Sequence, residues 1–448
     1  MTDATSSSAV HFNLTAGLDR SLAWSQGGSV RYLVAEMSAS DAGPPRTEVP
    51  ALNLALAIDV SGSMSGDRIE AAQRAALVLV DALGARDRLS VVAFDGTAEL
   101  LLDARPMDAA GRTAAQYAIG KLEVRGNTNL FDGWLLAAER VAVSMAADSR
   151  AAHRVLILSD GQANQGLTDR RQIAQHVGAL LERGVLTSAL GIGDGYDEEL
   201  LGAIAEAGGG TLHDAASTPE IAEVVLSELQ EGRTALLERV MLRIAVPATL
   251  RAELVGTVGQ VGQPGVLEVM VGRLLPGQTK RVVVRLHCPS GQPGSVLAVG
   301  VSAAGSPPDS GHAVTAGPVT VDLHFAHGSD NNAQPRDLAR SLSVVQVWQA
   351  DAVREAARMN RDGEGRAAKH YLARELRWLE PYARGVPGAE ALLAGLILVQ
   401  RRVEERWDER TVKEVYVGAM QASQGQFSVL SERRMSLSER FAPGAPKV

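Results

Sequence analysis

An acid and two hydroxyls stand at every second position from Asp59 to Ser63. In an extended turn, residues at this spacing can direct three side-chain oxygens toward one point. Hard cations such as Mg²⁺ take oxygen ligands, so Asp59, Ser61 and Ser63 are candidate ligands of a single metal ion. The segment also has a simpler interpretation, in which Ser63 or Ser65 caps the following helix and Asp67 favours its positive end.

Two later segments add a third hydroxyl and a second carboxylate. The polar loop at residues 125–130 contains Thr128 and leads into a stretch with helical periodicity. The apolar run at residues 155–158 is followed by a serine and then by Asp160. Each residue has an ordinary alternative role, with Thr128 or Asn129 as a helix N-cap and Asp160 as a turn residue. All three segments in this order, within a β-α alternation, favour one shared site.

This arrangement resembles a von Willebrand factor A (VWA) domain with a complete metal-ion-dependent adhesion site (MIDAS), of the bacterial intracellular type. The family motif is Asp-x-Ser-x-Ser, then a Thr, then an Asp, and the matching residues are Asp59, Ser61, Ser63, Thr128 and Asp160. The resemblance implies a Rossmann-like α/β fold with a mostly parallel sheet. It also implies a bound Mg²⁺, with Mn²⁺ or Ca²⁺ as alternatives, and a partner carboxylate that completes the coordination.

The elements around these residues alternate between strands and helices, as in α/β domains. A continuous apolar run at residues 53–58 has the length of a buried strand, and residues 69–83 return to helical periodicity. In an open α/β sheet, ligands bind where the carboxyl end of a strand meets the next helix. The alternation predicts an α/β domain over residues 51–233, which the resemblance implies to be a VWA domain.

The remaining chain predicts two further parts. Period-two alternation with turn signals indicates a β-sandwich over residues 234–327. Strand-like stretches within residues 1–50 have no partners of their own, so we expect the VWA domain to be inserted in this sandwich. The alternative is a separate N-terminal hairpin, with the sandwich following the VWA domain. An isolated hairpin, however, is marginal in water. A polar linker at residues 328–335 then leads to a helical bundle over residues 336–422 and a loosely held tail over residues 423–448.

Composition excludes several functional classes. The formal net charge is −8, which argues against a general nucleic-acid-binding surface. The single cysteine, Cys288, cannot form an internal disulfide and fits a reducing compartment. Residues 1–8 do not have the pattern of a secretory signal, and no apolar run approaches the length of a membrane span. We therefore expect a cytoplasmic protein with no nucleic-acid partner and no membrane span.

Signals for catalysis are weak. Residues 191–195 have the glycines of a dinucleotide loop, but Tyr196 stands where the third glycine is needed. A nucleophile elbow would need serine where Met64 stands, and a phosphoaspartate-forming phosphatase usually has an acid where Ser61 stands. Three histidines lack metal-ligand spacing, and we expect each at the surface or at a strand end: His153, His176 and His213. We expect no enzyme.

The combined expectation is a non-catalytic, Mg²⁺-dependent protein–protein interaction module or scaffold within an intracellular multiprotein assembly. In it, the MIDAS metal binds an acidic side chain of the partner. The resemblance to intracellular bacterial relatives points to an AAA+ ATPase or a member of a signalling or defence assembly as the partner. Two alternatives stay open, a metal-assisted hydrolase or phosphatase and an extracellular adhesin.

Overall fold

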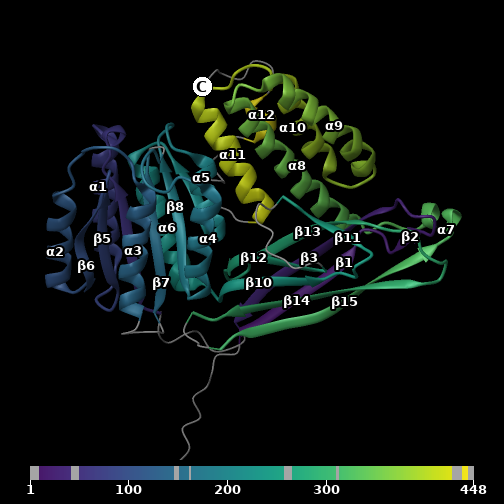
Figure 1. The fold of residues 1–448 in the computed structure, drawn as a ribbon, viewed down its shortest axis with the longest axis horizontal. Helices are drawn as coiled ribbons and strands as arrows, with labels where there is room; N and C mark the ends of the chain where they lie inside the picture. The colour runs from purple at the N-terminus through teal and green to yellow at the C-terminus, as the bar shows by residue number, and fades with distance from the viewer. Residues whose placement is uncertain are drawn as a thin grey trace, which may run out of the picture.

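The computed structural model describes residues 10–41, 50–145, 151–160, 163–256, 265–308, 312–425 and 436–441. It contains an α/β part, a part made of two sheets, and a group of C-terminal helices (Figure 1). The helices that follow residue 337 lie above both other parts in this view, and α11 (Glu409–Gln424) faces the α/β part. None of the described helices has the length and apolar character needed to cross a bilayer.

The described strands of the α/β part form one six-stranded sheet in the order β6-β5-β4-β7-β8-β9. Their bounds are β4 Leu52–Asp59, β5 Arg88–Phe94, β6 Ala98–Pro106, β7 Ala152–Ser159, β8 Val185–Ile192 and β9 Gly209–Ala215. All neighbouring strands are parallel except β5 and the edge strand β6, which are antiparallel. The strands β4, β7, β8 and β9 are buried along their whole length. The prediction of a mostly parallel sheet in an α/β fold is confirmed.

Helices cover both faces of this sheet. They are α1 Asp67–Ala82, α2 Ala109–Gly120, α3 Leu130–Met145, α4 Arg170–Glu182, α5 Glu198–Ala207 and α6 Thr218–Thr234. Residues of α1, α2 and α6 share one hydrophobic cluster, and residues of α3, α4 and α5 share another. Alternate residues of β4 join opposite clusters, with Leu54 and Leu56 in the first and Ala55 and Ala57 in the second. The continuous apolar run of β4 follows from this two-sided burial.

The N-terminal strands pair with strands from the middle of the chain. β1 (Val10–Leu18) is antiparallel to β3 (Val30–Asp41), and β3 is antiparallel to β13 (Thr279–His287). The orders are β1-β3-β13-β11 in one sheet and β12-β10-β14-β15-β2 in the other. Residues of both sheets contribute to one hydrophobic cluster, and the α/β part is inserted in the sequence between β3 and β10. The other strands are β2 Leu22–Trp24, β10 Leu237–Ala245, β11 Arg251–Val255, β12 Val266–Leu274, β14 Val296–Ser306 and β15 Val314–Ala326.

The C-terminal helices extend beyond the predicted bundle on both sides. Their bounds are α7 Gly328–Ala333, α8 Leu338–Arg361, α9 Gly365–Ala383, α10 Ala389–Arg402, α11 Glu409–Gln424 and α12 Leu437–Arg440. The predicted linker contains α7, and Gln334 after it accepts a hydrogen bond from the Leu22 amide at 2.7 Å. Within the predicted bundle, α10 and α11 are separate helices, and Asp408 caps α11 by accepting the Thr411 amide at 2.7 Å. The predicted tail contains the short helix α12.

Candidate metal site

The two predicted acids leave neighbouring parallel strands at the same edge of the sheet. β4 ends at Asp59, and β7 ends at Ser159, immediately before Asp160. The two strands pair directly, with Ile58 opposite Leu158. Parallel strands place their carboxyl ends at one edge, so residues about 100 positions apart in sequence emerge side by side.

The loop that carries Thr128 is bonded to the loops on both sides of it. The Gly62 amide, in the turn after β4, donates to the Gly126 carbonyl at 3.2 Å. The Thr128 amide donates to Asn164 Oδ1 at 3.0 Å, and the Thr128 carbonyl accepts the Asn164 amide at 3.1 Å. Since Asn164 follows β7 by a few residues, the third loop lies between the segments that carry the two acids.

Asp59 is fully buried and has neutral hydrogen-bond donors. Its Oδ1 accepts the Ser61 amide at 2.9 Å, and its Oδ2 accepts the Ser159 hydroxyl at 2.5 Å. Burial raises the pKa of Asp59 to about 6, and the nearby Asp160 charge adds to this rise, while the bonds from Ser159 and Ser61 oppose it. Burial therefore disfavours the ionised form of Asp59, and a bound cation would favour it.

Hydrogen bonds join the remaining motif residues to Asp160. The Ser61 and Ser63 hydroxyls are 3.1 Å apart, and the Ser63 hydroxyl donates to Asp160 Oδ1 at 2.7 Å. Arg68 Nη1 donates to Asp160 Oδ2 at 2.6 Å. Both oxygens of this buried carboxylate thus have a donor. Together with the bond from the Ser61 amide to Asp59, these bonds connect four of the predicted ligands, Asp59, Ser61, Ser63 and Asp160.

Thr128 is placed by its backbone. It is buried, and its backbone bonds to Asn164 fix it between the two acidic loops. Among the described residues, no side-chain hydrogen bond links its hydroxyl to the other four predicted ligands. The structure thus places the Thr128 backbone between the two acidic loops, and the role of its hydroxyl as a ligand stays a prediction.

The helix-cap interpretations of these residues have different outcomes. The N-cap of α1 is Gly66, with φ 77° and no side-chain cap bond, so neither Ser63 nor Ser65 caps this helix. Asn129 does cap α3, because its Oδ1 accepts the Asp132 amide at 3.3 Å. Capping by Asn129 orients the loop that carries Thr128, so the structural role and the proposed ligand role belong to adjacent residues.

The donor set fits an oxygen-preferring divalent cation. It consists of two carboxylates and three hydroxyls, which are hard ligands of the kind that Mg²⁺ takes. Throughout the part of the chain that the structure describes, no group of three or more His, Cys, Asp or Glu side chains is arranged to hold a metal. Among the described residues, the mixed carboxylate and hydroxyl set is therefore the candidate metal site.

Residues 52–214 match the family model described as von Willebrand factor type A domain. This part of the chain is a VWA domain. The sequence is 29% identical over 254 residues to the uncharacterized protein sll0103 of Synechocystis, covering 54% of this chain and 59% of that protein. It is 30% identical over 186 residues to the uncharacterized protein YfbK of Escherichia coli, covering 41% of this chain and 32% of YfbK. The chain thus spans less than two thirds of the length of either relative.

Solved structures share the arrangement beyond the VWA domain. A von Willebrand factor type A protein from Catenulispora acidiphila aligns with a TM-score of 0.71 at 19% identity, covering 93% of this chain and 97% of that chain. The ArnB paralog VWA2 from Sulfolobus acidocaldarius aligns with a TM-score of 0.59 at 16% identity, covering 92% and 99%. These alignments show that the fold of nearly the whole chain recurs in both proteins.

The glycine-rich loop of the VWA domain does not form a dinucleotide site. The Tyr196 ring packs over Gly191, where an added Cβ would lie 2.4 Å from the ring. The Tyr196 hydroxyl donates to Asp214 Oδ1 at 2.9 Å. Arg410 of α11 donates to both oxygens of Asp214, at 3.0 and 2.9 Å. Asp214, the acid at about the position of a ribose ligand, is therefore already paired within the protein.

His213 corrects the expectation for the histidines. It lies within β9 and is buried, and its Nε2 is 2.7 Å from Glu228 of α6. Arg273 of β12 also bonds to Glu228, at 2.7 Å. His213 is thus part of a buried polar contact between the VWA domain and the two-sheet part. The sequence gives no signal for this contact, because its members are separated by up to 60 positions.

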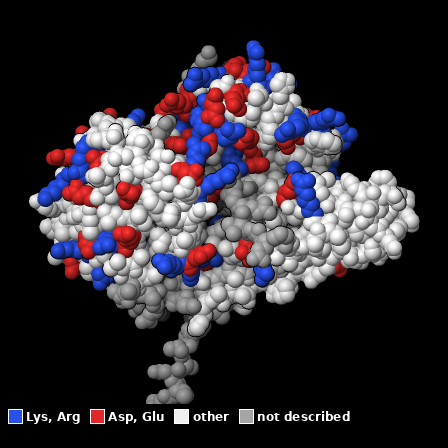
Figure 2. Space-filling model, in the orientation of Figure 1, with Lys and Arg blue, Asp and Glu red and all other residues white. Residues whose placement is uncertain are grey.

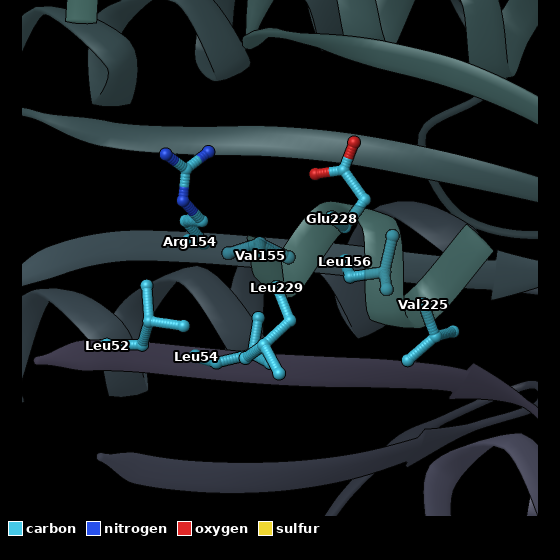
Figure 3. A pocket seen from close by; sticks show the side chains of 8 residues that line it. All are labelled: Leu52, Leu54, Arg154, Val155, Leu156, Val225, Glu228 and Leu229. Atoms are coloured by element: carbon cyan, nitrogen blue, oxygen red, sulfur yellow. The ribbon is translucent and has the colours of Figure 1, made fainter. Parts of the chain in front are cut away.

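A small cavity lies between α6 and the strands β4 and β7 (Figure 3). Its volume is about 20 Å³, and its lining is mainly apolar, including Leu54, Leu156 and Val225. A space of this size holds at most one water molecule. It also borders the first half of β4, far along the strand from Asp59, so it is not part of the candidate metal site.

Proposed function

We propose that this protein is a non-catalytic, metal-dependent protein–protein interaction module. In this proposal Asp59, Ser61, Ser63, Thr128 and Asp160 hold one Mg²⁺, with Mn²⁺ or Ca²⁺ as alternatives. The observation that carries the proposal is the 2.7 Å hydrogen bond from Ser63 to Asp160. It joins motif residues that are 97 positions apart, and such close approach is a requirement for a shared ion.

The charges of the donor set determine what the site would bind. Two carboxylates balance one divalent cation, and the three hydroxyls add no charge. When bound, the ion supplies a Lewis-acidic coordination position for an incoming oxygen ligand. Ser63 is exposed to solvent, so the site opens to the surface on its side. An anionic Asp or Glu side chain of a partner protein fits such a position best.

We further propose where such a module acts. The partner class is an AAA+ ATPase or a member of a signalling or defence assembly, and the location is the cytoplasm. The two-sheet part and the C-terminal helices would give the partner additional contact surface. This part of the proposal depends on the resemblance to intracellular bacterial VWA proteins.

A pull-down in Mg²⁺ compared with EDTA tests the proposal. The bait is the whole chain, with Asp59→Ala as the site variant and Glu70→Gln as the control, since Glu70 is an exposed acid on α1 that pairs with Arg74 at 3.4 Å. We expect a partner that elutes with EDTA from the wild type and Glu70→Gln and does not bind Asp59→Ala. Partner binding that EDTA does not reverse would contradict metal dependence. Mg²⁺-dependent turnover of a phosphoester, lost in Asp59→Ala, would contradict the non-catalytic assignment.

A further inference from the structure

Arg68 reaches from the surface onto the candidate metal site. It is the second residue of α1, and its side chain is 42% exposed, whereas the Asp160 side chain is fully buried. Its Nη1 donates to Asp160 Oδ2 at 2.6 Å and to the Ser63 carbonyl at 3.0 Å. One guanidinium therefore contacts both a predicted metal ligand and the turn that carries Ser61 and Ser63.

The contact gives Asp160 a positive partner within the protein. A buried carboxylate without such a partner is costly, and Ser63 supplies only a neutral donor to the other oxygen. Among the described residues, Asp59 has no comparable partner, because its donors are the Ser61 amide and the Ser159 hydroxyl. Arg68 thus provides part of the positive charge that the two acids need.

The loop after β8 packs closely against this pair. An added Cβ at Gly193 would lie 3.3 Å from Arg68 Nε, and Gly193 has φ 71°, a conformation that favours glycine. An added Cβ at Gly195 would lie 3.1 Å from the Asp160 carbonyl oxygen. The Arg68–Asp160 pair is therefore packed on one side by backbone, unlike an ion pair that projects into solvent.

We propose that Arg68 competes with the divalent cation for Asp160 and thereby sets the metal affinity of the site. This inference rests on the proposed metal-binding function. In the metal-free protein, the guanidinium stabilises the Asp160 carboxylate. A divalent cation at the same carboxylate meets a fixed like charge, so binding requires Arg68 to give up or weaken its bond to Oδ2.

The test compares Arg68→Ala with Arg125→Ala. Arg125 is a matched control, because its side chain is 46% exposed, lies on the neighbouring loop and pairs with Glu99 at 2.6 Å, with no bond to a predicted ligand side chain. Calorimetric titration of MgCl₂ at fixed ionic strength gives the affinity of each protein. We expect Arg68→Ala to bind Mg²⁺ about fivefold more tightly than the wild type, and Arg125→Ala to differ by less than about twofold.

Thermal unfolding of the same variants separates competition from a structural role. In EDTA, Arg68→Ala should melt below the wild type, because Asp160 loses its partner. The rise in Tm on adding saturating Mg²⁺ should be larger for Arg68→Ala than for the wild type. Arg68→Lys, which keeps the charge with fewer donors, should lie between the two.

The outcomes distinguish this inference from the proposed function. Equal or weaker Mg²⁺ binding by Arg68→Ala, with a wild type that binds, would overturn the competition and leave the metal site intact. A wild type and an Arg68→Ala variant that both fail to bind Mg²⁺, Mn²⁺ or Ca²⁺ would overturn the inference and the proposed function together.

Discussion

Buried acids occur in two regions of the VWA domain, and the protein balances their charge in different ways. Asp59, at the carboxyl edge of the sheet, accepts hydrogen bonds from a serine hydroxyl and a backbone amide. Asp214, on the edge strand β9, accepts two bonds from Arg410 of α11 and one from a tyrosine hydroxyl. Both are almost completely buried. The difference is that a cation of the protein balances the charge of Asp214, while the donors to Asp59 among the described residues are neutral.

The same contrast holds for the surroundings of Asp214. Glu198, at the start of α5, is fully buried and pairs with Arg361 of α8 at 2.9 Å and with Lys413 of α11. Charged side chains gather along this boundary between the VWA domain and the C-terminal helices (Figure 2). At this boundary, arginines and a lysine of the C-terminal helices balance the buried acids, and these pairs hold the helices against the VWA domain.

In the candidate metal site, Asp160 pairs with the partly exposed Arg68, whereas Asp59 has no cation of the protein beside it among the described residues. One of the two acids is thus left without a balancing charge, which fits binding of an ion.

Breaking a buried pair at the boundary should give the largest effect. We expect Glu198→Gln to lower the free energy of unfolding by about 4 kcal/mol, because Lys413 would stay buried without a full negative charge. Glu99→Gln, which breaks the exposed pair with Arg125, should cost less than about 1 kcal/mol. Urea denaturation with and without Mg²⁺ measures both. Since Glu198 does not belong to the metal site, Glu198→Gln should lower the free energy of unfolding by the same amount in EDTA and in Mg²⁺. A loss that depends on Mg²⁺ would contradict the division between the two regions.

The pH dependence of the boundary gives the next effect. Burial raises the pKa of Glu206 to about 7 from its ordinary value of 4.5, although Arg354 and a hydrogen bond from Gln424 oppose the rise. The folded protein then holds a proton that the unfolded chain releases, so this contribution is full below pH 4.5 and is lost as the pH rises through 7. We expect it to amount to about 3 kcal/mol.

Replacing Glu206 by Gln isolates this contribution. Glu206→Gln stays neutral, so its stability relative to the wild type should increase between pH 5 and pH 8. Denaturant titrations in EDTA at both pH values measure the difference, with Glu139→Gln on the exposed side of α3 as the control. A parallel pH dependence in wild type and Glu206→Gln would show that this carboxyl is ionised throughout.

A single hydroxyl of the metal site should have the smallest effect. Ser61→Ala removes one neutral donor and leaves both carboxylates, so we expect Mg²⁺ affinity to fall by about fivefold, or about 1 kcal/mol. Ser65→Ala is the control, because the Ser65 hydroxyl donates to the Gly62 carbonyl in the same turn. Calorimetry that gives equal losses for both serines would show that the turn matters as a whole and that Ser61 has no specific role.

The two regions also differ in how far the sequence predicts them. The candidate ligands follow strands or precede a helix, so a motif of local spacings and the rule for sheet edges brought together Asp59, Ser61, Ser63 and Asp160. The partners within the site were missed: Ser159 bonds to Asp59, and Arg68 bonds to Asp160. Both stand next to a motif segment, and an apolar run that ends in Ser-Asp was the available signal for Ser159.

The boundary between the VWA domain and the C-terminal helices was not predictable in this way. Asp214 and Arg410 are 196 positions apart, and no pattern in one segment indicates a partner in the other. The tryptophans of the helical bundle show the same limit. Trp348 is buried, but Trp378 is 63% exposed on α9. Helical periodicity locates such residues on a face and does not decide whether that face meets another part of the chain.

The central claim is that Asp59 and its fellow ligands hold one divalent ion. Thermal unfolding of the wild type, Asp59→Ala and Glu70→Gln during a Mg²⁺ titration tests it most directly, since a ligand that binds the native state raises Tm by mass action. We predict a saturable rise in Tm for the wild type and Glu70→Gln, equivalent to about 2.7 kcal/mol at a hundred times the Kd, and no rise for Asp59→Ala. The same rise in all three proteins, or none in the wild type, would contradict the account.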